Sequence, residues 1–203
     1  MEQSYNQITL RGTLREKPAF SHENHGKRFF RFLLEVPRLS ATVDVLPVVA
    51  EEFLLRTVPV SEGSQITVCG QIRSHNHRNE EGRHLLIFVF ACSIVIEDGE
   101  SINDVLLEGR LCREPTYRRT PLGREICDVM LAVPRAFGRA DYIPCILWGR
   151  TAQQAALCHT RDILQISGRL QSRGYTKVTE QGSLQRTAYE VSALSAIFPE
   201  EEP

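Results

Sequence analysis

Residues 103–111, NDVLLEGRL, match the stretch NQITLRGTL at residues 6–14 at four of nine positions, Asn103, Leu107, Gly109 and Leu111. The similarity runs without a gap from residues 6–47 to residues 103–144 at a constant offset of 97, and 12 of these 42 positions are identical. A chain of 203 residues is long enough for two domains of about 100 residues, each with its own core. The repeat therefore predicts two copies of one fold.

Each copy is predicted to contain five short strands and one helix. In the second copy, apolar and polar residues alternate along 105–111 and again along 127–133, the period of a strand with one buried face. Between them, residues 114–124 contain proline and glycine at spacings that suit a hairpin loop. The remaining elements of this copy are strands at 140–148, 163–175 and 185–198 and an alanine-rich helix at 151–158. The first copy follows the same order, with a helix near 51–56 and its fourth strand at 65–74.

A helix between the third and fourth of five strands is the element order of the OB-fold, a small Greek-key barrel. We therefore predict an all-β chain of two tandem OB-fold five-stranded Greek-key barrels. The first barrel would span residues 1–98 and the second 102–198, with a short acidic tail at 199–203. Phe30 and Phe32 of the first copy align with interior positions of the second, so we expect them to pack in the core.

Composition narrows the classes of function. No apolar run approaches the roughly 20 residues of a membrane helix, and the N-terminus does not resemble a signal peptide, so a cytoplasmic protein is expected. The six cysteines form no CxxC pair and most lie in apolar runs, which favours buried free thiols over a zinc site. The histidines cluster in predicted turns, and two of them together are a weak metal signal. No nucleophile is paired with a base, so neither catalysis nor a cofactor is expected.

The two copies differ in charge and in aromatic residues. Residues 1–101 carry a net charge of −2, whereas residues 102–198 carry +4. The basic copy has aromatic side chains at four positions where the first copy has Ser40, Val45, Glu51 and, roughly, Asn76: Phe137, Tyr142, Trp148 and Tyr175. Strand alternation places Tyr142 and Trp148 on one face of their strand. The same rule places Arg169, Gln171, Arg173 and Tyr175 on one face of the following strand.

The second copy, from Asn103 to Phe198, resembles the bacterial single-stranded DNA-binding proteins of the SSB family. The residues that carry the resemblance are NDVLLEGRL at 103–111, the turn at Pro115, LAV at 131–133, ADYIPCILWGRTA at 140–152, ISGRLQSRGY at 166–175 and YEV at 189–191. The resemblance implies that Phe137, Tyr142, Trp148 and Tyr175 stack on the bases of single-stranded DNA. Basic residues near these rings and in the first loop are candidate phosphate contacts: Arg135, Arg139, Arg150, Arg173, Lys177, Arg118 and Arg119.

The first copy departs from the family at all four stacking positions, and Glu51 would repel a phosphate backbone. We therefore expect this barrel to serve assembly or partner contact. The resemblance implies four barrels per assembly, hence a homodimer, with a role in DNA replication, recombination or repair.

The chain ends at Phe198-Pro-Glu-Glu-Glu-Pro203, without the long Gly/Pro/Gln-rich spacer and apolar tip that housekeeping members use to recruit replication and repair proteins. An auxiliary or mobile-element role is therefore favoured. Two alternatives stay open. The barrels could form a protein-interaction or scaffold module of a replication-restart or mobile-element complex with weak affinity for DNA, and RNA could replace DNA as the ligand.

Overall fold

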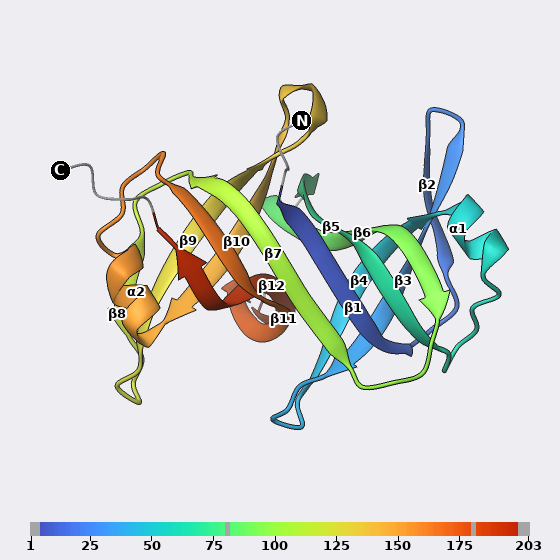
Figure 1. The fold of residues 1–203 in the computed structure, drawn as a ribbon, viewed down its shortest axis with the longest axis horizontal. Coiled ribbons are helices and arrows are strands. Elements are labelled where there is room, and N and C mark those ends of the chain that lie inside the picture. The colour runs from blue at the N-terminus through green and yellow to red at the C-terminus, as the bar shows by residue number, and fades with distance from the viewer. Residues whose placement is uncertain (1–4, 80–81, 180–181, 199–203) are drawn as a thin grey trace.

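Two small β-barrels lie side by side and meet through antiparallel strands at the centre of the molecule (Figure 1). The computed structural model describes residues 5–79, 82–179 and 182–198. The first barrel contains β1 (Asn6–Leu14), β2 (Ala19–Asn24), β3 (Lys27–Pro37), β4 (Val43–Glu51), α1 (Glu52–Thr57), β5 (Gln65–Asn79) and β6 (Gly82–Ile96). The second contains β7 (Ile102–Leu111), β8 (Thr116–Arg119), β9 (Glu125–Pro134), a 3₁₀ turn η1 (Ala136–Gly138), β10 (Ala140–Trp148), α2 (Gly149–Ala155), β11 (Ile163–Thr179) and β12 (Gly182–Ile197). No helix in these described ranges could cross a membrane.

Each barrel is closed by its first strand, which pairs with two others. In the first barrel the order β3-β4-β6-β5-β1 returns to β3 where Leu14 lies opposite Leu34. The second barrel closes in the same way where Leu111 lies opposite Leu131. Within each barrel, one pair of strands is parallel, β4 with β6 and β10 with β12, and the others are antiparallel. This is the five-stranded Greek-key topology of the OB-fold.

The strands form where the sequence alternates, because one face of each strand packs into its barrel. The interior side chains of β10, Ile143, Cys145 and Leu147, are at most 3% exposed. This strand has the predicted bounds, whereas α2 begins two residues before its predicted start. The sequence analysis missed β2 and β8, the latter within the predicted loop at 114–124. Every residue of both strands is exposed, so neither has the alternation that periodicity detects.

The prediction for Phe30 and Phe32 is only half correct. Phe32 is buried in the core, but Phe30 is half-buried and packs edge-on against Phe20, with 5.9 Å between ring centroids. The guanidinium of Arg28 lies 5.5 Å from the centroid of Phe30. Phe30 lies opposite both Phe20 of β2 and Ala50 of β4, where the β2–β3 hairpin that extends beyond the barrel begins (Figure 1), so its ring packs on the hairpin.

The prediction of buried thiols holds for half of the cysteines. Cys127, Cys145 and Cys158 are buried, and burial is the main cause that raises the pKa of Cys127 to about 11. Cys69 and Cys92 are exposed, although each lies in an apolar run. Cys69 alternates with buried Val68 on β5 and therefore points outward. An apolar run is thus a poor guide to burial on a strand with one solvent-facing side.

The contact between the barrels has approximate two-fold symmetry. Strands β1 and β7 pair antiparallel, with Ile8 directly opposite Val105. These two residues are equivalent positions of the repeat, so the pseudo-two-fold axis passes between them. The interface therefore has the self-complementary form of a symmetric dimer, built here within one chain.

Two fully buried carboxylates, those of Asp44 and Asp141, accept hydrogen bonds across the contact between the barrels. Asp44 Oδ1 accepts hydrogen bonds from the backbone N–H (2.7 Å) and hydroxyl (3.0 Å) of Ser172 in the second barrel. In the symmetric contact, Asp141 Oδ1 accepts a 2.7 Å hydrogen bond from the backbone N–H of Ser74 in the first barrel. Burial alone would raise the pKa of Asp44, but hydrogen bonds from Arg38 and Ser172 outweigh it and hold that pKa below its ordinary value.

We expect Asp44→Asn to lower the free energy of unfolding by about 3 kcal/mol at pH 7, because it removes one partner of a buried ion pair. The pKa of Asp44 is depressed in the folded state, so its stabilisation is present above the unfolded value of about 3.9 and is lost as the pH falls through the folded value. The difference between the wild type and the variant should therefore shrink below about pH 4. Urea denaturation at several pH values measures it. Asp104→Asn, on the exposed side of β7, is the matched control.

Candidate nucleic-acid interface

Two exposed aromatic side chains mark the outer face of β10, the side that points away from the barrel core. Tyr142 and Trp148 alternate with the buried residues of this strand, which confirms the predicted orientation. Six residues of extended strand separate their Cα atoms by about 20 Å. The two rings are therefore separate flat surfaces along one strand and do not enclose a single pocket.

Trp148 is held at the end of β10 by contacts with two other strands. It lies opposite Ile126 of β9, and its indole Nε1 donates a 3.1 Å hydrogen bond to the hydroxyl of Ser192 on β12. Ser192 is itself buried. The hydrogen bond fixes the ring and satisfies its polar atom, while about a third of the residue, 36%, faces solvent.

Tyr142 lies at the seam between the barrels. Its backbone N–H donates a 2.7 Å hydrogen bond to the hydroxyl of Ser74 in the first barrel. The preceding residue, Asp141, accepts the hydrogen bond from the backbone of the same serine. The first barrel thus contacts the backbone at Tyr142, although it contributes no aromatic residue at the equivalent position.

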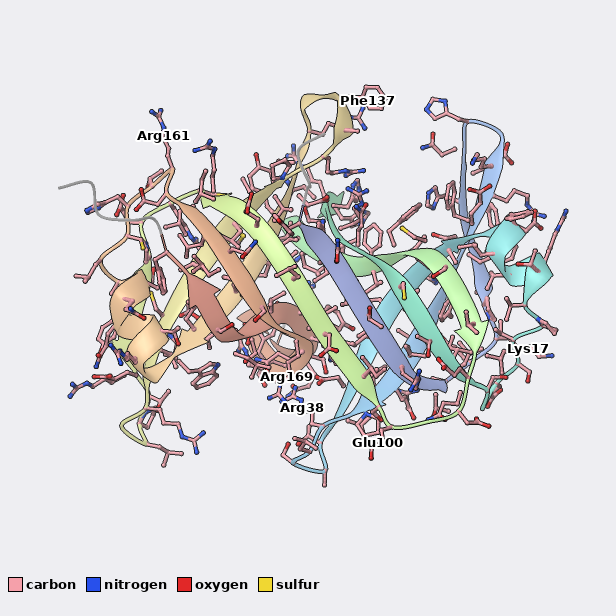
Figure 2. The ribbon with its side chains drawn as sticks, viewed as in Figure 1. Lys17, Arg38, Glu100, Phe137, Arg161 and Arg169 are labelled. Atoms are coloured by element: carbon pink, nitrogen blue, oxygen red, sulfur yellow. The ribbon has the colours of Figure 1, made fainter. Side chains whose placement is uncertain are left out.

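The other two predicted rings come from different elements. Tyr175 lies on β11, exposed and opposite Arg186 of β12. Phe137 lies at the tip of the loop between β9 and β10 and points away from both barrels (Figure 2). It is 99% exposed, and its backbone φ of 61° lies in the left-handed region, which residues other than glycine seldom adopt. The four rings therefore come from three separate elements, β10, β11 and the loop between β9 and β10.

Four of the predicted phosphate-contacting arginines are already paired with carboxylates. Their N–O distances are 2.7 Å for Arg118 and Asp128, 3.0 Å for Arg119 and Glu125, 3.4 Å for Arg135 and Asp141, and 3.6 Å for Arg173 and Glu190. Arg135 belongs to the seam, because Asp141 is buried there. Each of these pairs would compete with a phosphate for the guanidinium.

Arg139 and Arg150 are exposed and form no ion pair with an acid in the described part of the chain. Their charges are therefore free for an anionic ligand. Lys177 lies near the tip of β11, and its side chain is outside the described residues, as is the acidic tail at 199–203. Arg169 and Gln171 lie on the same side of β11 as Arg173; Arg169 is half-buried, and Gln171 is buried and donates a 2.9 Å hydrogen bond to Glu190.

The sequence analysis missed two serines that hydrogen-bond the exposed aromatic residues of β10. Ser192 accepts the hydrogen bond of the Trp148 indole, and Ser74 accepts that of the Tyr142 backbone. Ser74 has an identical equivalent, Ser172, in the second copy, which was a usable signal. Within the described residues, no group of three or more His, Cys, Asp or Glu side chains could hold a metal ion.

Comparison with known proteins identifies the family of the chain. A model of the single-strand binding protein family matches residues 102–198. The single-stranded DNA-binding protein B of Bacillus subtilis is 41% identical over 80 residues, which cover 36% of this chain and 71% of that protein. The chain belongs to the single-strand binding protein family.

A second sequence relative matches over a smaller share of its length. The single-stranded DNA-binding protein of Bacillus cereus is 38% identical over 81 residues, 36% of this chain and 48% of that protein. The chain thus spans about half the length of this relative. A crystal structure of a deletion mutant of the single-stranded DNA binding protein from Thermus aquaticus covers 100% of this chain and 98% of its own, with a TM-score of 0.79 at 23% identity. This likeness confirms the predicted fold class of two tandem OB barrels.

We expect Phe137→Gly to leave the free energy of unfolding unchanged or to raise it by up to about 1 kcal/mol. The ring makes little contact with the barrels, and glycine adopts a positive φ without the steric cost that phenylalanine meets. Urea denaturation measures the effect. Leu122→Gly, at a similarly exposed apolar loop residue whose own φ is not positive, should not be stabilised. A decrease above 1 kcal/mol for Phe137→Gly would show that the ring supports the fold.

Proposed function

We propose that the protein binds single-stranded DNA without sequence preference and without catalysing a reaction, mainly through the second barrel. The observation that carries this proposal is the outer face of β10, where both rings are exposed, Ser192 holds the indole of Trp148 and Ser74 binds the backbone of Tyr142. Exposed flat rings offer stacking surfaces to any base, each worth about 1–3 kcal/mol. Relatives named single-stranded DNA-binding proteins support the same ligand.

The proposed path runs along the aromatic residues of the second barrel, Phe137, Tyr142, Trp148 and Tyr175. Phe137 adds support, because an almost fully exposed phenylalanine in a left-handed conformation costs conformational energy and packs against little of the fold. Arg139 and Arg150 are the first phosphate contacts in this proposal. Arg118, Arg119, Arg135 and Arg173 would contact phosphate only by exchanging a carboxylate partner, and Lys177 would add charge near the tip of β11.

We further propose the domain bounds, the assembly and the cellular role of the protein. The two domains are proposed to be residues 1–98 and 102–198, and two chains would associate into a homodimer of four barrels. The proposed role is in DNA replication, recombination or repair in the cytoplasm, at the nucleoid. Light scattering tests the assembly, and competition between DNA and RNA oligomers of matched sequence tests the ligand.

We expect oligo(dT) to quench the fluorescence of Trp148, the one tryptophan of the chain, with an affinity that falls as salt rises. The double variant Trp148→Ala/Tyr175→Ala should bind at least 30-fold more weakly in a gel or anisotropy assay, because two stacking surfaces are removed. Val45→Ala, at the first-barrel position equivalent to Tyr142, is the matched control and should bind normally. Unchanged fluorescence together with no gel shift would refute the proposal. A protein partner that co-purifies without DNA would then favour the scaffold alternative.

We expect Arg139→Ala or Arg150→Ala to weaken binding and to lower the slope of log K against log salt by about 0.7 for each phosphate that the variant no longer neutralises. Arg161→Ala changes the net charge equally, but Arg161 lies in the loop before β11 (Figure 2) and should leave the slope unchanged. Titration of labelled oligo(dT) at four salt concentrations measures the slope. Equal effects from all three variants would mean that only the overall charge matters.

A further inference from the structure

Four aromatic side chains lie on part of the outer face of the first barrel, at positions different from those in the second. The imidazole of His22 stacks on the ring of Phe29 with 4.9 Å between centroids and 12° between planes. Phe29 in turn packs against Phe90, with 5.9 Å between the ring centroids. Phe88 lies two residues before Phe90, on the same side of β6, and both are half-buried, with part of each residue open to solvent. We call His22, Phe29, Phe88 and Phe90, with Arg31 and Arg73, the first-barrel patch.

The first-barrel patch occupies the region that corresponds to Trp148 in the second barrel. Phe29 lies opposite Glu51 just as Ile126 lies opposite Trp148. Phe90 takes the place of Ser192, the residue that binds the Trp148 indole. Two glycines at matching bulges confirm this correspondence, since a Cβ on Gly70 or Gly168 would lie 2.2 Å from the carbonyl oxygen of Phe90 or Ser192 respectively. In the second barrel the ring at this location comes from β10, the equivalent of β4. In the first barrel the rings come from β6 and β3 instead.

The charges on the first-barrel patch are more favourable to an anion than the net charge of the barrel indicates. Arg31 stands where the second barrel has Asp128, and it forms no ion pair with an acid in the described part of the chain. Phe88 stands where the second barrel has the carboxylate of Glu190. The carboxylate of Glu51 is paired with the ammonium of Lys27 at 2.9 Å.

The first-barrel patch is continuous with the face that carries Tyr142. The guanidinium of Arg73 lies 6.0 Å from the ring centroid of Phe90 and also 3.0 Å from the carboxylate of Asp141, which precedes Tyr142. The next residue, Ser74, accepts the hydrogen bond from the Tyr142 backbone. A strand of DNA on Tyr142 that crosses the seam would therefore meet Arg73 and then Phe90.

We propose that the first-barrel patch is a second base-stacking surface, which holds the same single strand of DNA after it leaves Tyr142. This inference rests on the proposed function of the second barrel and extends the binding path across the seam. Phe88, Phe90 and His22 present the stacking surfaces, while buried Phe29 supports them from below. Arg31 contacts phosphate, and Arg73 positions the Phe90 ring and joins it to the seam.

A relocated tryptophan tests the proposal directly. In a Trp148→Phe background, Phe90→Trp keeps an aromatic ring at the site and becomes the one tryptophan of the chain. We expect oligo(dT) long enough to span both barrels to quench this fluorescence by at least 20%, and a short oligomer that occupies one barrel to quench it less. In the parent protein, the same oligomers report on Trp148. Quenching of Trp148 without any response from Phe90→Trp would overturn the second surface and leave the proposed function intact. If neither tryptophan responds to oligo(dT), both the second surface and the proposed function are overturned.

A charge reversal provides an independent test that leaves the rings in place. Arg31 is exposed, and Arg31→Glu places a carboxylate where the second barrel has Asp128, so folding should be unaffected. We expect it to weaken binding of the long oligomer 5- to 10-fold and binding of the short one less than 2-fold. Lys17→Glu makes the same charge change in the loop at the end of the barrel away from the seam (Figure 2) and should change neither. Equal effects from Arg31→Glu and Lys17→Glu would overturn the proposal.

The patch could instead be covered by protein. If a second copy of the chain covers it, the fluorescence of Phe90→Trp should shift with protein concentration in the absence of DNA and should not respond to oligo(dT). That result would overturn the proposal and assign the first-barrel patch to assembly.

Discussion

The antiparallel pairing of β1 with β7 is the contact on which the rest of the structure depends. It joins two closed barrels into one twelve-stranded sheet and sets the angle at which their outer faces meet. Asp44 and Asp141 reinforce it from both sides. A buried carboxylate is unfavourable unless several donors satisfy it, and here each is supplied partly by the opposite barrel. Separation of the barrels would therefore leave both carboxylates short of partners, which makes this relative orientation specific.

The sequence was sufficient to predict the fold, because the information needed for it is local and repeated. Alternation along β10 and the offset of 97 residues gave the strand, its orientation and the second copy. The pairing of side chains across strands was not predictable in this way. Arg118 and Asp128 are ten residues apart in sequence but adjacent in the β8–β9 hairpin, so the sequence shows a free arginine where the structure has an ion pair. The supporting hydrogen bond of Ser192 was hidden for the same reason.

Comparison of the copies position by position also obscured a compensating change. The gapless alignment ends at residue 47, and the same offset of 97 carried a few residues further places Glu51 where the second copy has Trp148. The rings that lie beside this position in the first barrel come from β3 and β6, where a change from Ile126 to Phe29 or from Ser192 to Phe90 looks like ordinary variation in a core. Only the folded arrangement reveals that neighbouring strands now supply the aromatic surface. A surface can thus keep its aromatic character while the strands that supply the rings change.

The pseudo-two-fold axis between Ile8 and Val105 has a consequence for any polymer that touches both barrels. A nucleic-acid strand has a direction, and rotation about this axis reverses it. A strand that passes straight from one outer face to the other therefore meets the second face with its 5′ and 3′ ends exchanged relative to the first. Hydrogen-bonding groups arranged for one polarity would be misplaced in the other, whereas a flat ring accepts a base from either direction. The symmetry of the seam itself favours recognition by stacking.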